Sequence, residues 1–484
     1  MNKIKEFLFE NKSMRQMVAK NTAWLAIGEM VSRLIRAGLI IYAARVLGTE
    51  GYGVFSYALS LAALFTIFSD IGLSPLLTRE IVKQPEKIKE YFSTSFILKL
   101  IILLSTVLIT LTIAPFFVKI EAARSLIPII VILIAFDSLR DFGFSLTRAE
   151  NRMETEAGLK IATNFAITAL GVIVLTIKPE TQTLAIAYAA GSGIGLALLI
   201  GKLWHQFKNA LAYFKKELIK PILTAAWPFA IMGLLGGFMI NIDTVILGWF
   251  KGSHELGLYA AAYRPVLLFY VIPAFLSTSL FPIMSRLIQE NKAEEMKKIL
   301  QKSLALVLGV ALPIALGGLI VAKPFITLLF GSEYSDASPA FQILMFTLFF
   351  VFPGTIISNA IFAYDRQRLF IFSMAGGAIL NIVLDILLIP SYSIVGSAVA
   401  TLISQIFING YNWYQLKKII SFTVLNNLGK VSISALAMAG IVILLAVLNT
   451  PVIITVIIGA LVFLVSLIIL KEPLLFEVRS IIWR

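Results

Sequence analysis

Three charged side chains, Glu29, Arg33 and Arg36, lie close together in a stretch of sequence that is otherwise largely apolar. The stretch, residues 21–46, is long enough to cross a bilayer as a helix. A charge there is costly and indicates a protein interior, a water-filled cavity or a pathway. Spacings of four and three residues place all three side chains on one face of the helix. This face is predicted either to bind an anion near the middle of the membrane or to form ion pairs that join helices.

The order of the charges distinguishes the two arginines. Glu29 precedes Arg33 by four residues, which is the favourable arrangement for an ion pair on a helix. Arg36 has no acidic residue within reach along the helix, so it is the arginine of this span that we expect to meet an anion. Glu29 is also a candidate for ion coupling.

A second cluster of charges, Asp137, Arg140 and Asp141, lies in the apolar stretch 125–147. Arg140 lies between two acids, so this cluster is predicted to be a self-satisfied ion-pair network. Its expected depth in the membrane matches that of the first cluster. Pairing between the two helices is therefore the alternative.

Polar residues also occur in later apolar stretches. Asp243 and Arg264 are predicted to form a buried pair or to take part in binding, and Asp243 could instead hold a proton or Na⁺. Asn381 and Asp385 lie four residues apart on one helix face, and Asn164 occupies the matching place in an earlier span. These side chains are predicted either to form hydrogen bonds between helices or to contact a ligand.

The composition shows which elements carry these residues. The chain has 484 residues, of which 59% are hydrophobic and 14% charged, whereas a soluble protein is about 25% charged. The apolar residues come in blocks of about 20 or more, which predicts an all-α, polytopic membrane protein with about fourteen transmembrane helices. With no cysteine and two histidines, the chain excludes disulfides, cysteine nucleophiles and histidine-rich metal sites, and we expect neither a metal nor a cofactor.

The distribution of Lys and Arg predicts the orientation. The formal net charge of +14 could indicate nucleic acid, but the basic residues lie mainly in loops on alternate sides of the predicted spans. With a cytoplasmic N-terminus, 30 of them fall on the cytoplasmic side and 5 on the outer side, which is the positive-inside pattern. Both termini are therefore expected in the cytoplasm, and no nucleic-acid partner is expected.

An internal repeat divides the chain. The run Gly51–Ala58 after the first span resembles Glu255–Ala262 after the seventh, and an even number of spans separates them. This indicates a parallel repeat of two six-helix lobes, with a substrate site expected where they meet. The predicted domains are a cytoplasmic amphipathic segment (1–20), an N-lobe (21–208), a cytoplasmic linker (209–222), a C-lobe (223–418), and two peripheral spans with a cytoplasmic tail (419–484).

Several short motifs carry a resemblance to a known family. In their order and spacing they are similar to the polysaccharide transporter family, the lipid-linked oligosaccharide flippases of the multidrug/oligosaccharidyl-lipid/polysaccharide exporter superfamily. The similarity covers nearly the whole chain. The motifs are Ala44–Gly53, Asp70–Leu73 with Arg79–Glu80, Asn241–Asp243 followed by Gly257–Tyr259, Phe330–Tyr334, and Ile389–Pro390 followed by Gly396–Thr401.

The resemblance implies a non-enzymatic activity in cell-surface polysaccharide biosynthesis. A polyprenyl-(pyro)phosphate-linked oligosaccharide would move from the cytoplasmic to the outer leaflet of the cell membrane by alternating access of two lobes. In related lipid II flippases, arginines on the first and eighth helices meet the pyrophosphate. The matching positions here are Arg33, Arg36 and Arg264. Leu267 stands where those relatives often have an acid, so the polar cluster differs here.

Two other classes of protein compete with this interpretation. A Na⁺- or H⁺-coupled multidrug exporter would use acids such as Glu29, Asp243 or Asp385. A membrane glycosyltransferase would normally carry catalytic acids or His in a sizeable outer loop, and none is apparent here. The expected partners are the lipid-linked sugar, membrane lipid, H⁺ or Na⁺, and a glycan polymerase or glycosyltransferases. The candidates for ion coupling or a polar cavity are Glu29, Asp137, Arg140, Asp141, Asn164, Asp243, Asn381 and Asp385.

Overall fold

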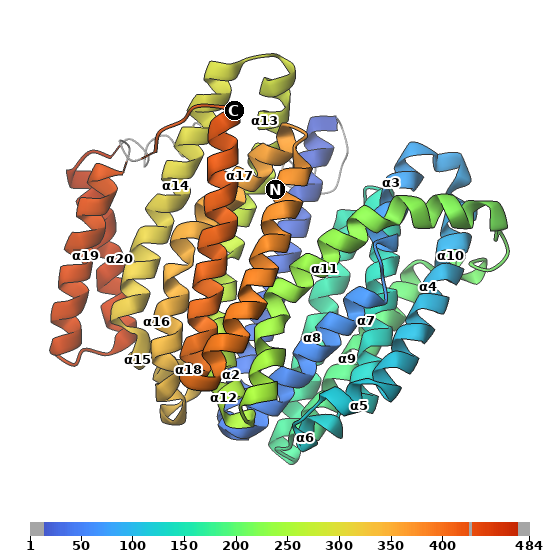
Figure 1. Ribbon diagram of the computed structural model, residues 1–484, viewed down its shortest axis with the longest axis horizontal. Coiled ribbons are helices and arrows are strands. Elements are labelled where there is room, and N and C mark those ends of the chain that lie inside the picture. The colour runs from blue at the N-terminus through green and yellow to red at the C-terminus, as the bar shows by residue number, and fades with distance from the viewer. Residues whose placement is uncertain (1–13, 425–427, 473–484) are drawn as a thin grey trace, which may run out of the picture. The chain divides into compact units, whose positions relative to one another are not determined.

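The structure, a computed structural model, describes residues 14–424 and 428–472, and every regular element in these two ranges is a helix (Figure 1). The first ten long or short α-helices and two 3₁₀ turns are α2 (Met14–Phe68), α3 (Leu73–Lys83), η1 (Pro85–Lys87), α4 (Ile88–Thr112), α5 (Ala114–Phe117), α6 (Glu121–Arg124), α7 (Ile127–Ala149), α8 (Met153–Ile177), α9 (Thr181–Lys202), α10 (Trp204–Lys208), η2 (Lys216–Leu218) and α11 (Ile219–Phe250). The later elements are α12 (Ser253–Phe269), α13 (Val271–Gln289), α14 (Ala293–Ile320), α15 (Ala322–Phe330), η3 (Ser332–Ala337), α16 (Ser338–Phe346), α17 (Leu348–Ala363), α18 (Gln367–Ile419), α19 (Gly429–Val447) and α20 (Val452–Ile469).

The described helices account for the fourteen predicted spans. Eleven helical stretches are long and apolar enough to cross a membrane. Two of them, within α2 and α18, are each a pair of helices joined at a non-helical residue, Gly48 with φ 67° and Ser393 with φ 50°. Helix α7 adds a further span, which lies outside the apolar set because it carries four charged residues, Asp137, Arg140, Asp141 and Arg148. The predicted fold class, an all-α polytopic membrane protein, is confirmed.

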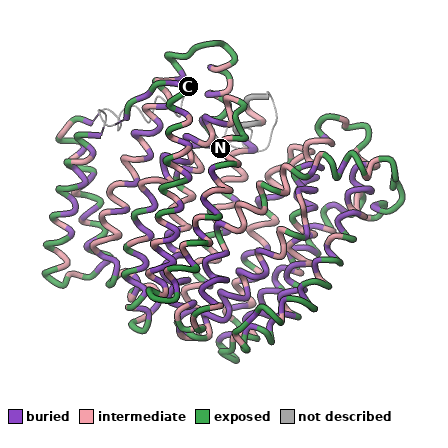
Figure 2. Tube along the Cα trace, in the orientation of Figure 1, coloured by how far each residue is buried: buried purple, intermediate pink, exposed green. Residues whose placement is uncertain are grey.

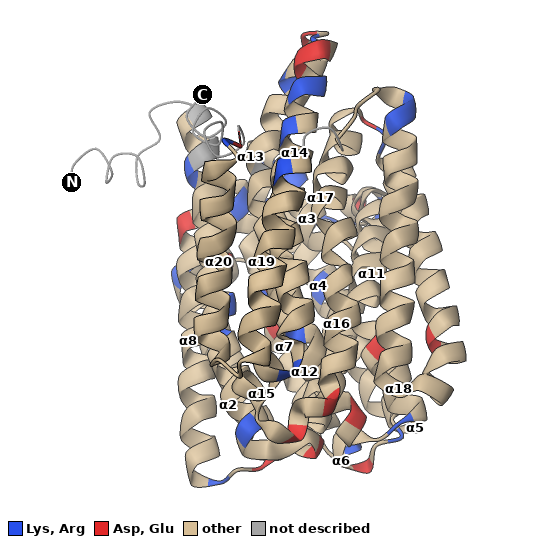
Figure 3. Ribbon diagram, turned by 90° about the vertical axis from the view of Figure 1, so that its left-hand side faces the viewer, with Lys and Arg blue, Asp and Glu red and all other residues tan. Residues whose placement is uncertain are grey.

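The surfaces of the helices suit a lipid environment. On α4, the side chains of Ile101, Leu104 and Leu108 are more than half exposed, which is unfavourable in water but favourable against lipid. Charged residues concentrate toward the helix ends, and most of the length of each helix is uncharged (Figure 3). The few charges between the ends therefore stand out as the candidates for function.

Helix packing divides the chain into two compact units, and the first ends at Gly257. Helix α11 belongs to this first unit because it packs against α2 and α3. The predicted linker, 209–222, thus lies inside unit 1 and includes the start of α11. The predicted six-helix lobes stay a prediction. Residues 1–13 of the predicted N-terminal segment and 473–484 of the tail lie outside the described residues.

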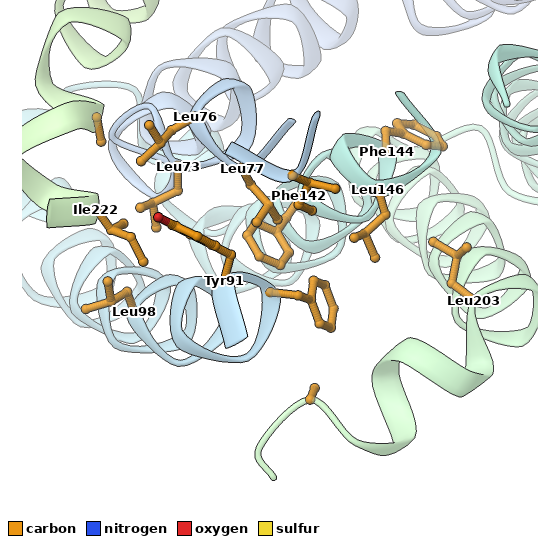
Figure 4. Packing of buried hydrophobic residues seen from close by; sticks show 14 of the residues in the cluster. Leu73, Leu76, Leu77, Tyr91, Leu98, Phe142, Phe144, Leu146, Leu203 and Ile222 are labelled. Atoms are coloured by element: carbon orange, nitrogen blue, oxygen red, sulfur yellow. The ribbon is translucent and has the colours of Figure 1, made fainter. Parts of the chain in front are cut away.

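Unit 1 has a core of aromatic and branched side chains from α3, α4 and α7 (Figure 4). Phe92 stacks on Phe142 with ring centroids 5.7 Å apart, and Phe207 meets Phe92 edge-on at 5.5 Å. Leu77 and Tyr91 point into the same cluster. Between membrane helices such close packing supplies the attraction that the hydrophobic effect supplies in water. The core fixes α7, which carries one of the charge clusters.

Unit 2 has a separate core that joins its last two helices to α14 and α15. Val431, Met438 and Val442 of α19 and Phe463 of α20 are buried against Val321. The opposite sides of α19 and α20 are exposed (Figure 2). An apolar exposed side and an apolar buried side are what a span at the edge of a bundle requires.

Two glycine-containing turns pack against each other within unit 1. A Cβ added to Gly53 would lie 1.8 Å from the carbonyl oxygen of Ser253, and one added to Gly257 would lie 2.0 Å from that of Thr49. A hydrogen bond of 2.8 Å joins the Thr49 hydroxyl to His254 Nδ1. The two turns are the repeat signals of the sequence, so the glycines serve the close approach of two backbones.

Replacing Gly53 or Gly257 with alanine is expected to lower the melting temperature of the purified protein and its yield as a monodisperse species, because backbone carbonyls cannot yield to a new methyl group. The matched control is Gly38→Ala on the same helix, where a Cβ would meet nothing within 4 Å. Gly38→Ala is expected to be neutral or stabilising, since alanine favours a helix by about 1 kcal/mol over glycine. An unchanged melting temperature for Gly53→Ala would contradict this account.

Candidate functional site

The charges of the first span are partly neutralised as their spacing predicts. Arg33 Nε donates to Glu29 Oε1 at 2.7 Å, and both side chains remain about two-fifths exposed. Lys160 of α8 adds a second cation to Glu29 at 3.5 Å. The charge of Arg33 is therefore compensated by Glu29 in the absence of a ligand. An anion that binds Arg33 would have to compete with this carboxylate.

Arg36 has neutral partners instead. Its Nε donates to Asn164 Oδ1 at 2.8 Å, and its guanidinium lies 5.7 Å from the ring centroid of Tyr188 on α9. Asn164 is itself oriented by donating to the Lys160 carbonyl oxygen at 2.8 Å. Among the residues that the structure describes, no carboxylate pairs with Arg36. The amide and the ring position this guanidinium without neutralising it, so its charge is available to an anion.

The cluster on α7 is closed on itself. Arg140 Nη2 lies 2.7 Å from Asp137 Oδ1, and Arg140 Nη1 donates to the Ser192 hydroxyl of α9 at 2.9 Å. Ser192 in turn donates to Asp137. The self-satisfied network that the sequence predicts is present, and it joins α7 to α9 rather than to the first helix. Asp141 makes the longer contact of this network, at 4.0 Å from Arg140.

Glu156 is a buried acid that the sequence analysis did not single out. It is fully buried at the start of α8, and Arg148 binds it in bidentate fashion through bonds of 2.8 and 2.7 Å. Lys160 adds a contact of 3.0 Å from the next turn. The available signal was an acid four residues before a lysine, facing an arginine across a short loop. This carboxylate is the ion-pair partner of Arg148 and shares Lys160 with Glu29.

Lys99 and Asp70 form another buried pair. Lys99 has no exposed surface and lies 2.7 Å from Asp70 Oδ1. Asp70 also accepts hydrogen bonds from the hydroxyl and backbone N–H of Ser74 in the first turn of α3, at 2.5 and 3.3 Å. The pair thus ties the start of α3 to α4.

Unit 2 contributes one cation and a buried polar group. Arg264 of α12 is half-buried and has no hydrogen bond or ion pair with any described residue. Asn381 and Asp385 of α18 are buried, and the Asn381 amide makes no hydrogen bond within the described ranges. On the second half of α18, Thr401 makes a hydrogen bond of 3.3 Å with Tyr259.

The turn at Ser393 places the two halves of α18 side by side. A Cβ on Gly396 would lie 2.6 Å from the Leu388 carbonyl oxygen, and one on Gly377 would lie 2.2 Å from Ile408. The same antiparallel register brings Asn381 to the level of Ser404 and Asp385 to that of Thr401. Oxygen-bearing side chains from two helices therefore gather at one depth in unit 2.

The structure sorts the predicted site residues into two groups. Arg36 and Arg264 are the cations of the predicted site that have no carboxylate partner in the described chain. Arg33 and Arg140 are paired with acids, as above. Asp243 is buried on α11 in unit 1. Among the described residues, each unit therefore holds one arginine of the predicted site that has no carboxylate partner.

Many helices of membrane-spanning length, with ion pairs between them, define a multi-pass membrane protein. The family model described as "Polysaccharide biosynthesis protein" matches residues 18–288, more than half of the chain, and the chain belongs to this family. A second family model, MatE, matches residues 228–387. The predicted membership of the polysaccharide transporter family and its exporter superfamily is thereby confirmed.

Relatives of similar sequence agree with this family. The chain is 24% identical over 426 residues to a probable low-salt glycan biosynthesis flippase, Agl15, of Haloferax volcanii, covering 85% of this chain and 87% of the relative. It is 21% identical to a putative O-antigen transporter of Shigella flexneri, covering 79% and 94%.

Two solved structures share the fold. The lipid II flippase MurJ in an inward closed conformation has a TM-score of 0.78 at 18% identity and covers 93% of this chain and 99% of its own. An inward-facing multidrug resistance transporter of the MATE family has a TM-score of 0.64 at 15% identity, covering 86% and 98%.

Proposed function

We propose that this protein is a flippase that moves a polyprenyl-(pyro)phosphate-linked oligosaccharide from the cytoplasmic to the outer leaflet of the cell membrane. The observation that carries the proposal is Arg36, a guanidinium inside the membrane region that is positioned by an amide and a ring and has no carboxylate partner in the described chain. Relatives named as a glycan biosynthesis flippase and an O-antigen transporter support the class of substrate.

The mechanism follows from the chemistry of such a lipid. Its phosphates and sugars cannot cross about 30 Å of hydrocarbon unaided. Arginine gives phosphate two parallel, charge-assisted hydrogen bonds, so Arg36 and Arg264 would hold the headgroup while the polyprenyl tail stays in lipid. Arg33 would assist in binding the headgroup, because Lys160 also contacts Glu29 and can take over part of its charge. No bond is made or broken in the cycle, and alternating access of two lobes would expose the site to each side in turn.

The biological setting belongs to the same proposal. Both termini would lie in the cytoplasm, where glycosyltransferases assemble the sugar on its carrier, and a glycan polymerase would receive it on the outer side. The positive-inside distribution of basic residues supports this orientation.

The experiment that tests the function is flipping in proteoliposomes. Purified protein is reconstituted with a defined set of fluorescent polyprenyl-(pyro)phosphate-linked sugars, and the accessible fraction is followed over time with and without H⁺ and Na⁺ gradients. Transfer that depends on the protein and on the phosphate supports the proposal. Transfer no faster than in protein-free vesicles, for every lipid in the set, would overturn it.

A second candidate function is a Na⁺- or H⁺-coupled multidrug exporter. The buried side-chain oxygens of Asn381 and Asp385 favour it, and the MatE family model matches the region that contains both residues. A buried carboxylate can hold a proton or a small cation. In the flippase itself the same residues would serve ion coupling.

Asp385→Asn distinguishes these roles. If Asp385 couples an ion to transport, the variant is expected to lose the stimulation of flipping by an imposed H⁺ or Na⁺ gradient while it keeps the gradient-free rate. The control is Asp336→Asn, an exposed aspartate in η3. A gradient response equal to that of the wild type would rule out coupling through Asp385. Export of drug-like cations without flipping of lipid would favour the second candidate.

A further inference from the structure

A pocket of about 360 Å³ lies inside unit 1 and has no role in the mechanism above. Residues from α2, α3, α4, α7, α8 and α11 form its walls. Its volume falls within the range of pockets that bind small molecules. The charged residues in its lining are Asp70, Lys99, Asp141, Arg148 and Lys160.

The cations of this pocket are already neutralised. Lys99 pairs with Asp70 at 2.7 Å, and both Arg148 and Lys160 contact Glu156, at 2.7 and 3.0 Å. A free anion would have to displace a carboxylate from each of them. The pocket therefore differs from the surroundings of Arg36 and favours a polar ligand that carries no charge at this position.

Two groups in the pocket retain capacity for hydrogen bonds. The Asp141 side chain is 58% exposed, makes no hydrogen bond in the described part of the chain, and has its ion-pair contact with Arg140 at 4.0 Å. The buried Lys99 ammonium makes one hydrogen bond, to Asp70, of the three that it can donate. Neighbouring hydroxyl groups of a sugar can donate to a carboxylate and accept from an ammonium. Pro75 and Phe229 supply an apolar wall for the apolar face of a sugar ring.

The pocket lies close to the proposed phosphate contact. Lys160, in its lining, is one helical turn from Asn164, a rise of about 6 Å along α8, and Asn164 accepts the hydrogen bond from Arg36. A sugar bonded directly to a phosphate at Arg36 would therefore reach this pocket.

We propose that the pocket binds the first sugar of the lipid-linked glycan, with Asp141 accepting hydrogen bonds from its hydroxyl groups. This assignment rests on the proposed function and deepens it. It places the phosphate beside a cation that has no carboxylate partner among the described residues and the sugar in a neighbouring pocket whose cations are neutralised. Arg36 selects the charged part of the headgroup, and the charge-compensated pocket selects the sugar. Asp141 is thereby a binding residue for the sugar.

Binding of two lipids to Asp141→Asn tests the assignment. The probes are polyprenyl pyrophosphate and the same lipid carrying one N-acetylhexosamine, each titrated against the full-length protein in nanodiscs. Asp141→Asn is expected to weaken binding of the sugar-bearing lipid about tenfold, the loss typical of one hydrogen bond to a charged group, and to leave the sugar-free lipid unaffected. Retained binding of the sugar-free lipid also shows that the variant is folded. Asp336→Asn is the matched control and should bind both lipids as the wild type does.

The remaining outcomes separate the assignment from the function. Equal weakening for both lipids would place Asp141 in the phosphate site and overturn the sugar assignment alone. Unchanged affinity for the sugar-bearing lipid would overturn it as well, as would a wild-type protein that does not prefer the sugar-bearing lipid. A wild-type protein that binds neither lipid would overturn the proposed function and the sugar assignment with it.

Discussion

Replacing Arg36 with alanine is expected to lower the rate of lipid flipping roughly 10- to 100-fold, because a hydrogen bond to a charged group contributes about 1.5–3 kcal/mol. The effect should be large because no carboxylate in the described chain competes for this guanidinium, so its whole charge acts on the phosphate. The fold should survive, since the partners left behind are the Asn164 amide and the Tyr188 ring. The measurement is flipping of a fluorescent polyprenyl-pyrophosphate-linked sugar in proteoliposomes.

Three further arginine variants make this result specific. Arg33→Ala removes the same charge from the same helix, but Arg33 is already paired with Glu29, so a much smaller loss is expected. Arg36→Lys keeps the charge and loses the two-pronged geometry, so it should restore only part of the rate. In unit 2, Arg264→Ala should resemble Arg36→Ala. Full flipping by Arg36→Ala, or equal losses in Arg33→Ala and Arg36→Ala, would refute the headgroup role.

Glu156→Gln is expected to lower the free energy of unfolding by about 3 kcal/mol, the lower end of the cost of breaking a buried ion pair. Glu156 is fully buried and holds both Arg148 and Lys160, so the amide would leave Arg148 without its carboxylate partner and Lys160 with only the longer contact to Glu29, at 3.5 Å. The lower end applies because Arg148 is 38% exposed and water offsets part of the loss. The measurement is the melting temperature and unfolding transition of the protein in detergent.

Glu86→Gln is the control for this prediction, because it makes the same change at an exposed glutamate of η1 in unit 1. Glu86 has no ion pair with any described residue, so little change in stability is expected. If both variants melt at the same temperature, the Glu156 network does not stabilise unit 1. If Glu156→Gln is stable but does not flip lipid, the network serves transport instead.

These predictions assign opposite purposes to two kinds of intramembrane charge. Arginines and lysines bound by carboxylates, such as Arg148 with Glu156 and Lys99 with Asp70, hold helices of unit 1 together. A cation held by a neutral side chain, such as Arg36 with Asn164, keeps its charge for a ligand. The same residue type therefore supports structure or function according to the charge of its nearest partner.

Local features of this protein could be predicted from the sequence because helix geometry fixes them. Apolar blocks of spanning length define the helices, and a four-residue spacing brings Glu29 to Arg33 whatever else the chain does. The network between Arg140 and Asp137 follows from a three-residue spacing in the same way. The prediction that Arg36 lacks a local acid also holds, since an ion pair on a helix needs a partner within about one turn.

Contacts between helices were decided only by the tertiary structure. Lys160 is shared by Glu29 and Glu156, and Arg148 binds Glu156 rather than joining the cluster on α7. Helix α11 packs against α2 and α3 within unit 1. Whether a cation has a carboxylate partner depends on which residues of neighbouring helices face it. That depends on how the helices rotate and slide against one another in packing, which spacing along a single helix does not contain.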